Sequence, residues 1–440
     1  MKNIIAEMVK KVTPSKTAQT ASKKISEEML DRVKKAAAKF PHVTDVQLGG
    51  SLAKGTWLGD ADVDIFVKFK RSVSREKFEE TAKKIGFESL KEYSPYVKYS
   101  EHPYVEAEIK KTRINVVPYY DVKPGKWKSS ADRSPYHTKL MKESLTAKMS
   151  GDVRVLKAFL KANGIYGAEI AREGFSGYVA EVLVLHFKSF EGVVRNMAGA
   201  DKNCVIGKVE KKFDSEVVIA DPVDGKRNLA AAISRQNMAK FVLLCRAFVA
   251  GPSASFFRKK RPRASKRLWN DLLVVSFAFR ERSPDKIWGQ VKRTASSLSR
   301  QLEIGGFVVL RSKAHIEKRA YLFFLLESGC IPLLYQKKGP ELSRTGSSEK
   351  FIKKNRKDLK LMWVKDDGRI ASLKEREYPD AVGFMRWFLK NNIQSDIPSG
   401  LQGDFVRGVK VFMGSDSLGK SIKEAAGELV STDGAFLYFD

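Results

Sequence analysis

Two short groups of residues near the N-terminus have the side chains that bind phosphate and metal ions. The first is Gly49-Gly50-Ser51 followed by Lys54, a turn whose backbone N–H groups, hydroxyl and ammonium suit a phosphate. The second is Asp62-Val63-Asp64. Residues two apart on a strand face the same side, so Asp62 and Asp64 would present two carboxylates to one spot. Mg²⁺ prefers oxygen ligands together with substrate phosphates, so we predict a site for a nucleoside triphosphate and Mg²⁺.

The elements that must position these groups follow from the periodicity of apolar residues. Val63, Ile65, Val67 and Phe69 alternate with other residues and predict a strand. The same reasoning predicts helices near 23–40 and 75–85 and strands at 104–109 and 113–119. Residues 1–145 are therefore expected to form one α+β domain.

The rest of the chain divides into a helical part and a second α/β part. Residues 152–250 are mainly helical in pattern, and 178–194 is apolar on nearly all sides, which predicts a buried helix. A basic run at 257–263 marks a boundary. Beyond it we expect strands at 272–279, 307–311 and 321–326, a helix at 285–304, and a polar, basic helical insertion at 336–360.

Composition favours a polyanionic partner and a reducing compartment. The chain has 440 residues, with 81 Lys and Arg against 51 Asp and Glu, a formal charge of +30. Such a field attracts nucleic acid, although a membrane surface or a charge kept for solubility stays open. The three cysteines lie far apart and indicate neither disulfides nor a zinc site. We expect a cytoplasmic protein without a secretory signal or a membrane span.

The Gly-Ser turn followed by an Asp-x-Asp strand resembles the signature of the polymerase β nucleotidyltransferase superfamily. Five later blocks narrow the resemblance to archaeal-type (class I) tRNA CCA-adding enzymes. These blocks are Glu101–Val105, Asp132–His137, Leu156–Gly167, Gly174–Tyr178 and Asp221–Asn228. The resemblance implies template-independent addition of C, C and A to the 3′ end of tRNA from CTP and ATP, with Mg²⁺ as cofactor. It leaves monomer and homodimer open.

The resemblance also implies a multi-domain α+β layout. A polymerase β-like head would span 1–145 and a helical neck 146–257. An α/β body would comprise 258–335 and 381–440, and a tail inserted in it would span 336–380. The head would be catalytic and the neck would select the base. The body and tail would bind tRNA, with the basic segments 258–263 and 353–357 contacting its phosphates; solvated surface charge is the alternative for these segments.

The resemblance assigns roles to individual residues of this chain. Gly50, Ser51 and Lys54 would bind triphosphate, and Asp62 and Asp64 the metal ions. Phosphate or sugar contacts fall to His137, Lys157 and Tyr166, and base contacts to Arg227, whose guanidinium can donate to acceptors of cytosine or adenine. Each of the last four also has a structural interpretation: the end of a loop for His137, core packing for Tyr166, and a solvated surface charge for Lys157 and Arg227.

One chemical position departs from the family pattern. Asn115 stands where the third carboxylate is expected, and an amide oxygen is a weak metal ligand that cannot take a proton from the attacking hydroxyl. If Lys110-Lys111 form a two-residue turn, Glu106 lies opposite Asn115 on the same face and could substitute for the carboxylate. A three-residue turn would send Glu106 to the other face. We expect an impaired site.

Two other functions stay open at this stage. A poly(A) polymerase or a terminal uridylyltransferase would have the same catalytic domain. A catalytically weakened RNA-binding relative would be consistent with Asn115.

Overall fold

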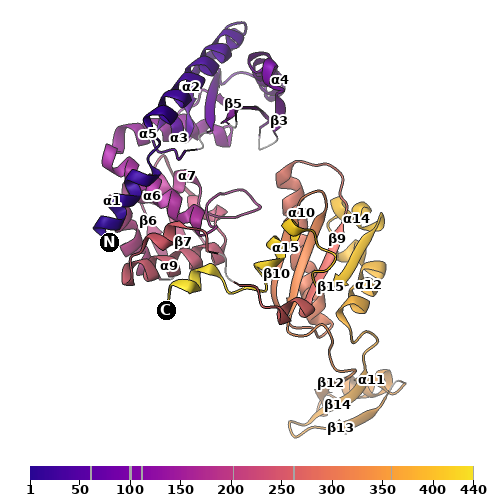
Figure 1. Ribbon diagram of the computed structural model, residues 1–440. Helices are drawn as coiled ribbons and strands as arrows, with labels where there is room; N and C mark the ends of the chain where they lie inside the picture. The colour runs from indigo at the N-terminus through magenta and orange to yellow at the C-terminus, as the bar shows by residue number, and fades with distance from the viewer. Residues whose placement is uncertain are drawn as a thin grey trace. The chain divides into compact units, whose positions relative to one another are not determined.

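The computed structural model describes residues 1–59, 62–98, 102–110, 112–201, 203–260, 263–357 and 359–439 (Figure 1). The chain forms two compact units, Met1–Arg261 with Gly434–Asp440, and Pro262–Asp433. In the described part of the chain, no helix has the length and apolar character that crossing a membrane requires.

The N-terminal part of the first unit is built on a five-stranded sheet of order β1-β2-β5-β4-β3. Its strands are β1 (Val43–Gly49), β2 (Val63–Phe69), β3 (Tyr96–Lys98), β4 (Tyr104–Ile109) and β5 (Thr112–Tyr120). Strands β2 and β5 run parallel, and the other neighbours run antiparallel. The strands predicted at 63–69, 104–109 and 113–119 are confirmed, the last one being a residue longer at each end.

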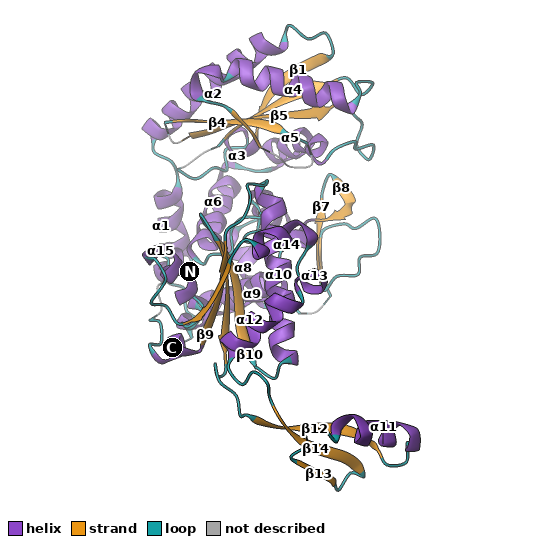
Figure 2. Cartoon of the chain, turned by 90° about the vertical axis from the view of Figure 1, so that its right-hand side faces the viewer, coloured by secondary structure: helices purple, strands orange, loops and turns teal. Residues whose placement is uncertain are grey.

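Helices α2 (Lys16–Ala37) and α4 (Arg75–Ser89) cover one face of this sheet (Figure 2). Val63, Ile65, Val67 and Phe69 of β2 are buried in the core beneath them. Because side chains alternate across a strand, Asp64 lies on the opposite face, on the same side as the short helix α3 (Gly50–Ala53) and α5 (Ser134–Ser144). We call the face that carries Asp64 the chemical face of the sheet; α2 and α4 do not cover it.

The remainder of the first unit is a helical bundle with a small sheet. Its helices are α1 (Lys2–Val12), α6 (Ala147–Ala162), α7 (Gly177–Phe187), α8 (Phe190–Ala198) and α9 (Arg235–Ala250). The sheet, of order β6-β7-β8, comprises β6 (Cys204–Ile206), β7 (Val217–Asp221) and β8 (Asp224–Asn228). The sequence predicted helices here and missed this sheet. Helix α1 also packs on this bundle, through the buried Met8, rather than on the large sheet.

The single helix predicted at 178–194 is wrong, since two helices occupy this stretch. Helix α7 ends where Lys188 adopts a left-handed conformation, φ 69°. Ser189 then caps α8, its hydroxyl accepting the N–H of Gly192 at 3.0 Å. The apolar pattern continues through the break because both helices bury their apolar residues in the same core.

The second unit contains a four-stranded sheet of order β10-β11-β9-β15 with helices on both faces. Its strands are β9 (Leu272–Phe277), β10 (Val309–Ile316), β11 (Ala320–Leu326) and β15 (Val409–Met413). Its helices are α10 (Pro284–Ile304), α12 (Ala381–Asn391), α13 (Ile393–Asp396), α14 (Ser399–Val406) and α15 (Lys420–Gly427). The helix predicted at 285–304 is confirmed, whereas the strand predicted at 307–311 begins later and runs to Ile316.

The helical insertion expected at 336–360 is confirmed in part, since these residues contain one helix, but that helix packs on a small sheet that the sequence did not predict. Strands β12 (Leu334–Glu341), β13 (Leu361–Val364) and β14 (Arg369–Glu375) form a sheet of order β12-β14-β13. One helix, α11 (Thr345–Asn355), packs on it. The sequence therefore predicted the helix but missed the strands on either side of it, because their stability depends on cross-strand pairing.

The C-terminal residues depart from the expected division, which placed everything after 380 in the body. From Gly434 on, the chain packs with the first unit. The Tyr438 ring stacks on Phe256 at 3.8 Å between centroids, and the Lys260 ammonium lies 3.7 Å from the Tyr438 ring centroid. These aromatic and cation–π contacts are the physical reason for the difference.

Candidate active site

A single row of residues crosses the large sheet on its chemical face. Gly49 pairs with Asp64, Asp64 with Asn115, Asn115 with Glu106, and Glu106 with Tyr96. Directly opposite residues share a face of the sheet. Glu106 therefore lies opposite Asn115, as the two-residue turn at Lys110-Lys111 predicts, although Lys111 itself is outside the described residues.

The Gly50 turn lies directly against the carboxylate of Asp64. Gly50 has φ +66°, and a Cβ built on it would lie 1.9 Å from Asp64 Oδ2. Any side chain here would both strain the backbone and displace the carboxylate. Ser51 and Lys54 follow immediately, so the turn and the carboxylate strand that the sequence singled out meet at one place.

Each of the two predicted carboxylates has a nitrogen partner from β5. Arg113 holds Asp62 through Nε and Nη2, at 2.9 and 2.8 Å. Asn115 Nδ2 donates to Asp64 Oδ1 at 2.8 Å. Desolvation raises the pKa of Asp64, and the charge of Asp62 adds to this effect, whereas the Asn115 amide opposes it.

The donor set of this site is suited to a divalent cation. Asp62, Asp64 and Asn115 offer hard oxygen ligands of the kind Mg²⁺ prefers. Asn115 Oδ1 is buried and has no hydrogen-bond partner among the described residues, so it is the orphan oxygen that a cation would satisfy. Within the described ranges no three His, Cys, Asp or Glu side chains gather to hold a metal ion. Because position 115 is an amide, this site has only two carboxylates, Asp62 and Asp64.

Glu106 is directed to the neighbouring strand β3. Its side chain is 4% exposed and accepts hydrogen bonds from the Tyr96 hydroxyl and from Lys98 Nζ, the latter at 2.9 Å. Burial alone would raise the pKa of Glu106, but these two hydrogen bonds bring it below its usual value. Both oxygens of this ionised carboxylate thus have partners on β3, away from Asn115.

A second cluster joins the Gly-Ser turn to the helical bundle through Glu181 of α7. The Glu181 side chain is 1% exposed and accepts hydrogen bonds from Lys54 Nζ, Lys157 Nζ and Thr56 Oγ1. Lys157 also donates to the Thr56 carbonyl at 3.0 Å and the Thr56 hydroxyl at 3.1 Å, which uses all three of its N–H groups. Lys54, predicted to bind triphosphate, and Lys157, predicted to contact phosphate or sugar, are therefore held by one carboxylate.

Sequence reasoning missed Glu181. Burial alone would raise the pKa of Glu181, but the ammonium groups of Lys157 and Lys54 hold it below its usual value. Desolvation lowers the pKa of Lys157, and Glu181 opposes that shift. The signal that could have found Glu181 is its position as the only acidic residue in the otherwise apolar stretch 179–185.

Tyr166 lies beside the same lysine. A Cβ on Gly177 would lie 3.0 Å from Tyr166 Oη and 3.5 Å from Lys157 Nζ, so both side chains approach this glycine. Burial, with the charges of Glu181 and Asp62, raises the pKa of Tyr166 to about 12. The hydroxyl therefore stays protonated and can donate a hydrogen bond.

His137 and Arg227 meet at a second buried carboxylate, Asp221, at the end of β7. His137 Nε2 lies 2.9 Å from Asp221 Oδ2, and Arg227 Nη1 lies 3.2 Å from the same oxygen. The Tyr178 hydroxyl donates to Asp221 Oδ1 at 3.0 Å, and the His137 and Tyr178 rings stack at 3.9 Å. Desolvation lowers the pKa of His137, although Asp221 opposes the shift.

Arg227 lines an open cavity of about 870 Å³. Trp127 and Arg133 also line it, together with Asp224 and Lys226 of the β7–β8 hairpin. Arg133 Nε donates to Asp224 Oδ2 at 2.8 Å. The cavity thus combines aromatic surface with guanidinium and carboxylate groups, which suits a nucleobase.

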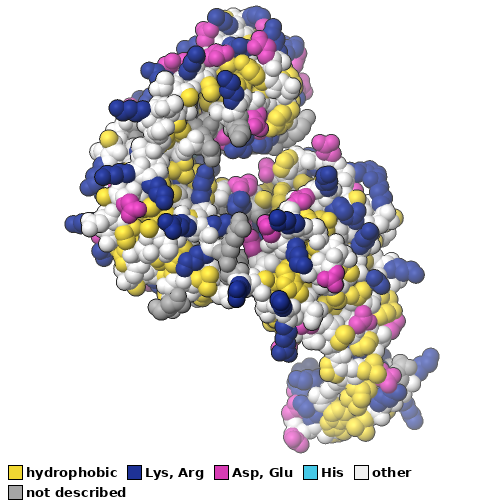
Figure 3. Space-filling view, in the orientation of Figure 1, with side chains coloured by type: hydrophobic (Ala, Val, Ile, Leu, Met, Phe, Trp, Pro, Cys, Tyr) yellow, Lys and Arg dark blue, Asp and Glu magenta, His cyan; other side chains and the backbone are white. Residues whose placement is uncertain are grey.

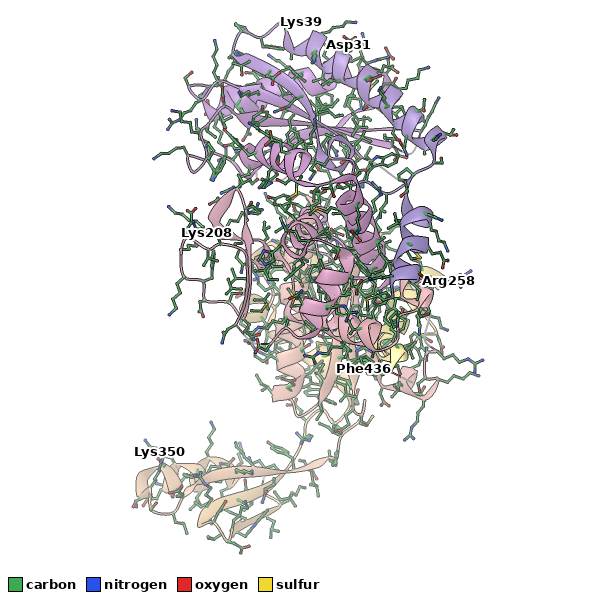
Figure 4. All side chains as sticks on the ribbon, turned by 90° about the vertical axis from the view of Figure 1, so that its left-hand side faces the viewer. Asp31, Lys39, Lys208, Arg258, Lys350 and Phe436 are labelled. Carbon is green, nitrogen blue, oxygen red and sulfur yellow. The ribbon has the colours of Figure 1, made fainter. Side chains whose placement is uncertain are left out.

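The basic segment at 353–357 belongs to the second unit, and the one at 258–263 spans the boundary between the two units. On the face drawn in Figure 3, Lys and Arg side chains are spread over both units rather than gathered in one patch. Arg258 extends from the surface of the bundle, and Lys350 from α11 (Figure 4). Lys260 binds the Leu437 carbonyl at 2.7 Å, so it is engaged within the protein; Arg261 and Pro262 are outside the described residues.

Comparison with known proteins gives consistent matches along the chain. The nucleotidyltransferase domain matches residues 23–137, the second domain of tRNA nucleotidyltransferase matches 151–258, and the C-terminal domain of CCA-adding enzyme matches 270–396. A solved structure of Cid1, described by its RNA terminal uridylyl transferase activity, is 12% identical with a TM-score of 0.46. It covers 59% of this chain and 97% of its own.

Curated relatives match at higher identity. The CCA-adding enzyme of Sulfurisphaera tokodaii is 35% identical over 378 residues, which are 84% of this chain and 88% of the relative. That of Archaeoglobus fulgidus is 34% identical over 371 residues, 81% of this chain and 83% of the relative. At this identity and coverage, the chain belongs to the CCA-adding enzyme family of tRNA nucleotidyltransferases.

Proposed function

We propose that this protein adds C, C and A to the 3′ end of tRNA, using CTP and ATP without a nucleic-acid template. The observation that carries the proposal is the contact between the Gly50 turn and the Asp64 carboxylate, with Lys54 in the same turn. A phosphate-binding turn that touches a metal-binding carboxylate is what nucleotidyl transfer requires.

The reaction is a displacement at the α-phosphate. The oxygen of the tRNA 3′-hydroxyl forms a bond to the α-phosphorus and its proton passes to water, while the bond from the α-phosphorus to the oxygen bridging to the β-phosphate breaks and pyrophosphate leaves. A bound Mg²⁺ would neutralise charge on the transferred and leaving phosphates. Asp62, Asp64 and the Asn115 amide would hold it.

The other residues bind and orient the nucleotide. The N–H groups of the turn and the Ser51 hydroxyl contact phosphate oxygens, and Lys54 adds positive charge next to them. Tyr166, which stays protonated, donates to a phosphate or sugar oxygen. His137 completes the sugar and phosphate side of the site, and Arg227 faces the base in the cavity that it lines. The three N–H groups of Lys157 are bonded to Glu181 and Thr56, so this lysine supports the segment after the turn and does not contact the nucleotide.

Position 115 sets the rate of the chemical step. Asn115 has no basic oxygen to accept the proton of the attacking hydroxyl. Glu106 is ionised, but its oxygens are bonded to Tyr96 and Lys98. We therefore expect nucleotide binding to be retained and the chemical step to be slowed by the missing carboxylate.

The test uses a tRNA transcript that lacks its 3′ CCA, with CTP, ATP, UTP or GTP supplied singly and together, each labelled. Extension that stops at C-C-A is the expected result. Homopolymer growth would instead indicate a poly(A) or terminal uridylyl activity, and tRNA binding without incorporation would indicate a non-catalytic relative.

The metal-binding assignment has its own test. Asp62→Ala and Asp64→Ala should each abolish incorporation at saturating Mg²⁺ while tRNA affinity, measured by filter binding, stays within about twofold, because RNA capture and metal chemistry use different groups. Asp45→Ala removes an exposed carboxylate from the same sheet and serves as the control. Incorporation at the control's rate by either site variant would remove that aspartate from the reaction.

A further inference from the structure

Asp221 is a buried carboxylate surrounded by donors from three separate segments. Its side chain is fully buried, and an ionised carboxylate in such a place is costly unless it is hydrogen-bonded. The Val223 N–H donates at 3.0 Å from its own hairpin. His137 of α5 and Arg227 of β8 reach one oxygen, and Tyr178 of α7 reaches the other. The position of Asp221 is thus set from all sides.

Arg227 is the partner of Asp221 that reaches the cavity. The Arg227 side chain is 42% exposed, and it lines the cavity, whereas Asp221 is fully buried behind that wall. Within the described part of the chain, the bond from Nη1 to Asp221 is the one hydrogen bond of this guanidinium. The remaining N–H groups of its planar fork are left for a ligand.

The direction of this fork decides which bases it can recognise. Cytosine presents a ring-nitrogen acceptor at N3 and adenine one at N1, whereas uracil and guanine carry an N–H at those positions. A donor held in one direction binds the first pair and meets an unfavourable donor–donor contact with the second. A guanidinium on a freely rotating side chain could turn to other acceptors, such as the carbonyl oxygens of uracil and guanine.

We infer that Asp221 is the positioning residue for base selection: by binding one edge of the Arg227 guanidinium, it directs the other N–H groups to the acceptor edge of cytosine or adenine. This inference rests on the proposed function and adds a residue that would never touch the nucleotide. Tyr178, His137 and the Val223 N–H hold Asp221 in turn.

The test is the ratio of kcat/KM for CTP to that for UTP, measured on tRNA transcripts that lack the CCA end. Asp221→Asn keeps the shape of the side chain and removes its charge. Misplacement by about 1 Å can cost about 10²-fold in rate, so we expect the CTP-to-UTP ratio to fall by about 10-fold or more. A ratio unchanged from wild type would overturn the inference.

Two variants separate positioning from general damage. Glu216→Gln removes an exposed carboxylate from the segment that leads into the same hairpin and should leave the ratio unchanged. The double variant Asp221→Asn with Arg227→Ala should discriminate between CTP and UTP no worse than Arg227→Ala alone, because substitutions of residues that act as a unit do not have additive effects. Independent, multiplicative losses would mean that Asp221 does not act through Arg227.

Failure of the inference is distinct from failure of the proposed function. A wild-type protein that does not prefer CTP and ATP contradicts the proposed function itself. If Asp221→Asn does not fold, as judged by its thermal transition, Asp221→Glu keeps the charge but moves the carboxylate by one methylene, which would misdirect the Arg227 guanidinium. Its discrimination should also fall by about 10-fold, and retained discrimination would overturn the inference.

Discussion

Replacing Asn115 by aspartate should make the protein less stable without a divalent cation and faster with one. Asn115 Nδ2 donates to Asp64 Oδ1 at 2.8 Å, and the substitution replaces that donor with a second carboxylate. A hydrogen bond to a charged group contributes about 1.5–3 kcal/mol. For a unit of this size, each kcal/mol moves the unfolding midpoint by about 2–4 °C, so in EDTA the midpoint of Asn115→Asp should fall by about 3–12 °C.

Magnesium should stabilise the Asn115→Asp variant more than it stabilises the wild type. The variant has a third carboxylate for the cation, so adding MgCl₂ should raise its midpoint by more than that of the wild type, since a ligand stabilises the state it binds. The gain of a proton acceptor should raise kcat by about 10² to 10⁴, with little change in nucleotide KM. Scanning calorimetry with and without EDTA and single-turnover CMP incorporation measure both effects.

The control is Asn196→Asp, which adds the same charge on the exposed surface of α8. It should alter neither the magnesium response nor kcat. If Asn115→Asp is as stable as wild type in EDTA and gains no activity, while Glu106→Gln abolishes incorporation, our reasoning fails and Glu106 is the third carboxylate.

Four further predictions follow from the geometry. Gly50→Ala would place a Cβ 1.9 Å from Asp64 Oδ2 and add about 1–2 kcal/mol of backbone strain. It should therefore reduce single-turnover incorporation at least 10²-fold and leave tRNA binding unchanged. Glu181→Gln removes the buried counter-charge of Lys54 and Lys157 and should cost about 3–5 kcal/mol of unfolding free energy in urea titrations; a loss below 1 kcal/mol would contradict the role of this cluster. Burial lowers the pKa of His137 in the folded protein below its usual 6.5. Between the folded and the unfolded pKa the unfolded chain therefore binds more protons, so stability should fall as pH drops below about 6.5. His137→Gln should make the melting temperature depend less on pH in this range. Exchanging exposed Lys353 and Lys354 of α11 for glutamine should reduce the slope of log tRNA affinity against log salt by about 1–2, whereas an unchanged slope would exclude α11 from the RNA contact.

Local periodicity was enough to predict much of the large sheet of the first unit. The strand at 63–69 follows from a period of two, which is a property of the backbone and needs no tertiary information; the strand begins at Val63, one residue after Asp62. Glycine at position 50 could likewise be assigned to a turn from its residue type. The family motifs then supplied the overall α+β arrangement, and the matches to family models confirm it.

The tertiary structure decided which partners the functional residues have. Glu181 bonds Thr56 across 125 positions, and His137 bonds Asp221 across 84. Such contacts depend on how helices and strands pack, which periodicity does not encode. The β4–β5 register was open in the sequence because two- and three-residue turns both fit, and the folded hairpin places Glu106 opposite Asn115. The break between α7 and α8 was hidden for a related reason: both helices bury apolar residues in one core, so their pattern is continuous although the backbone is not.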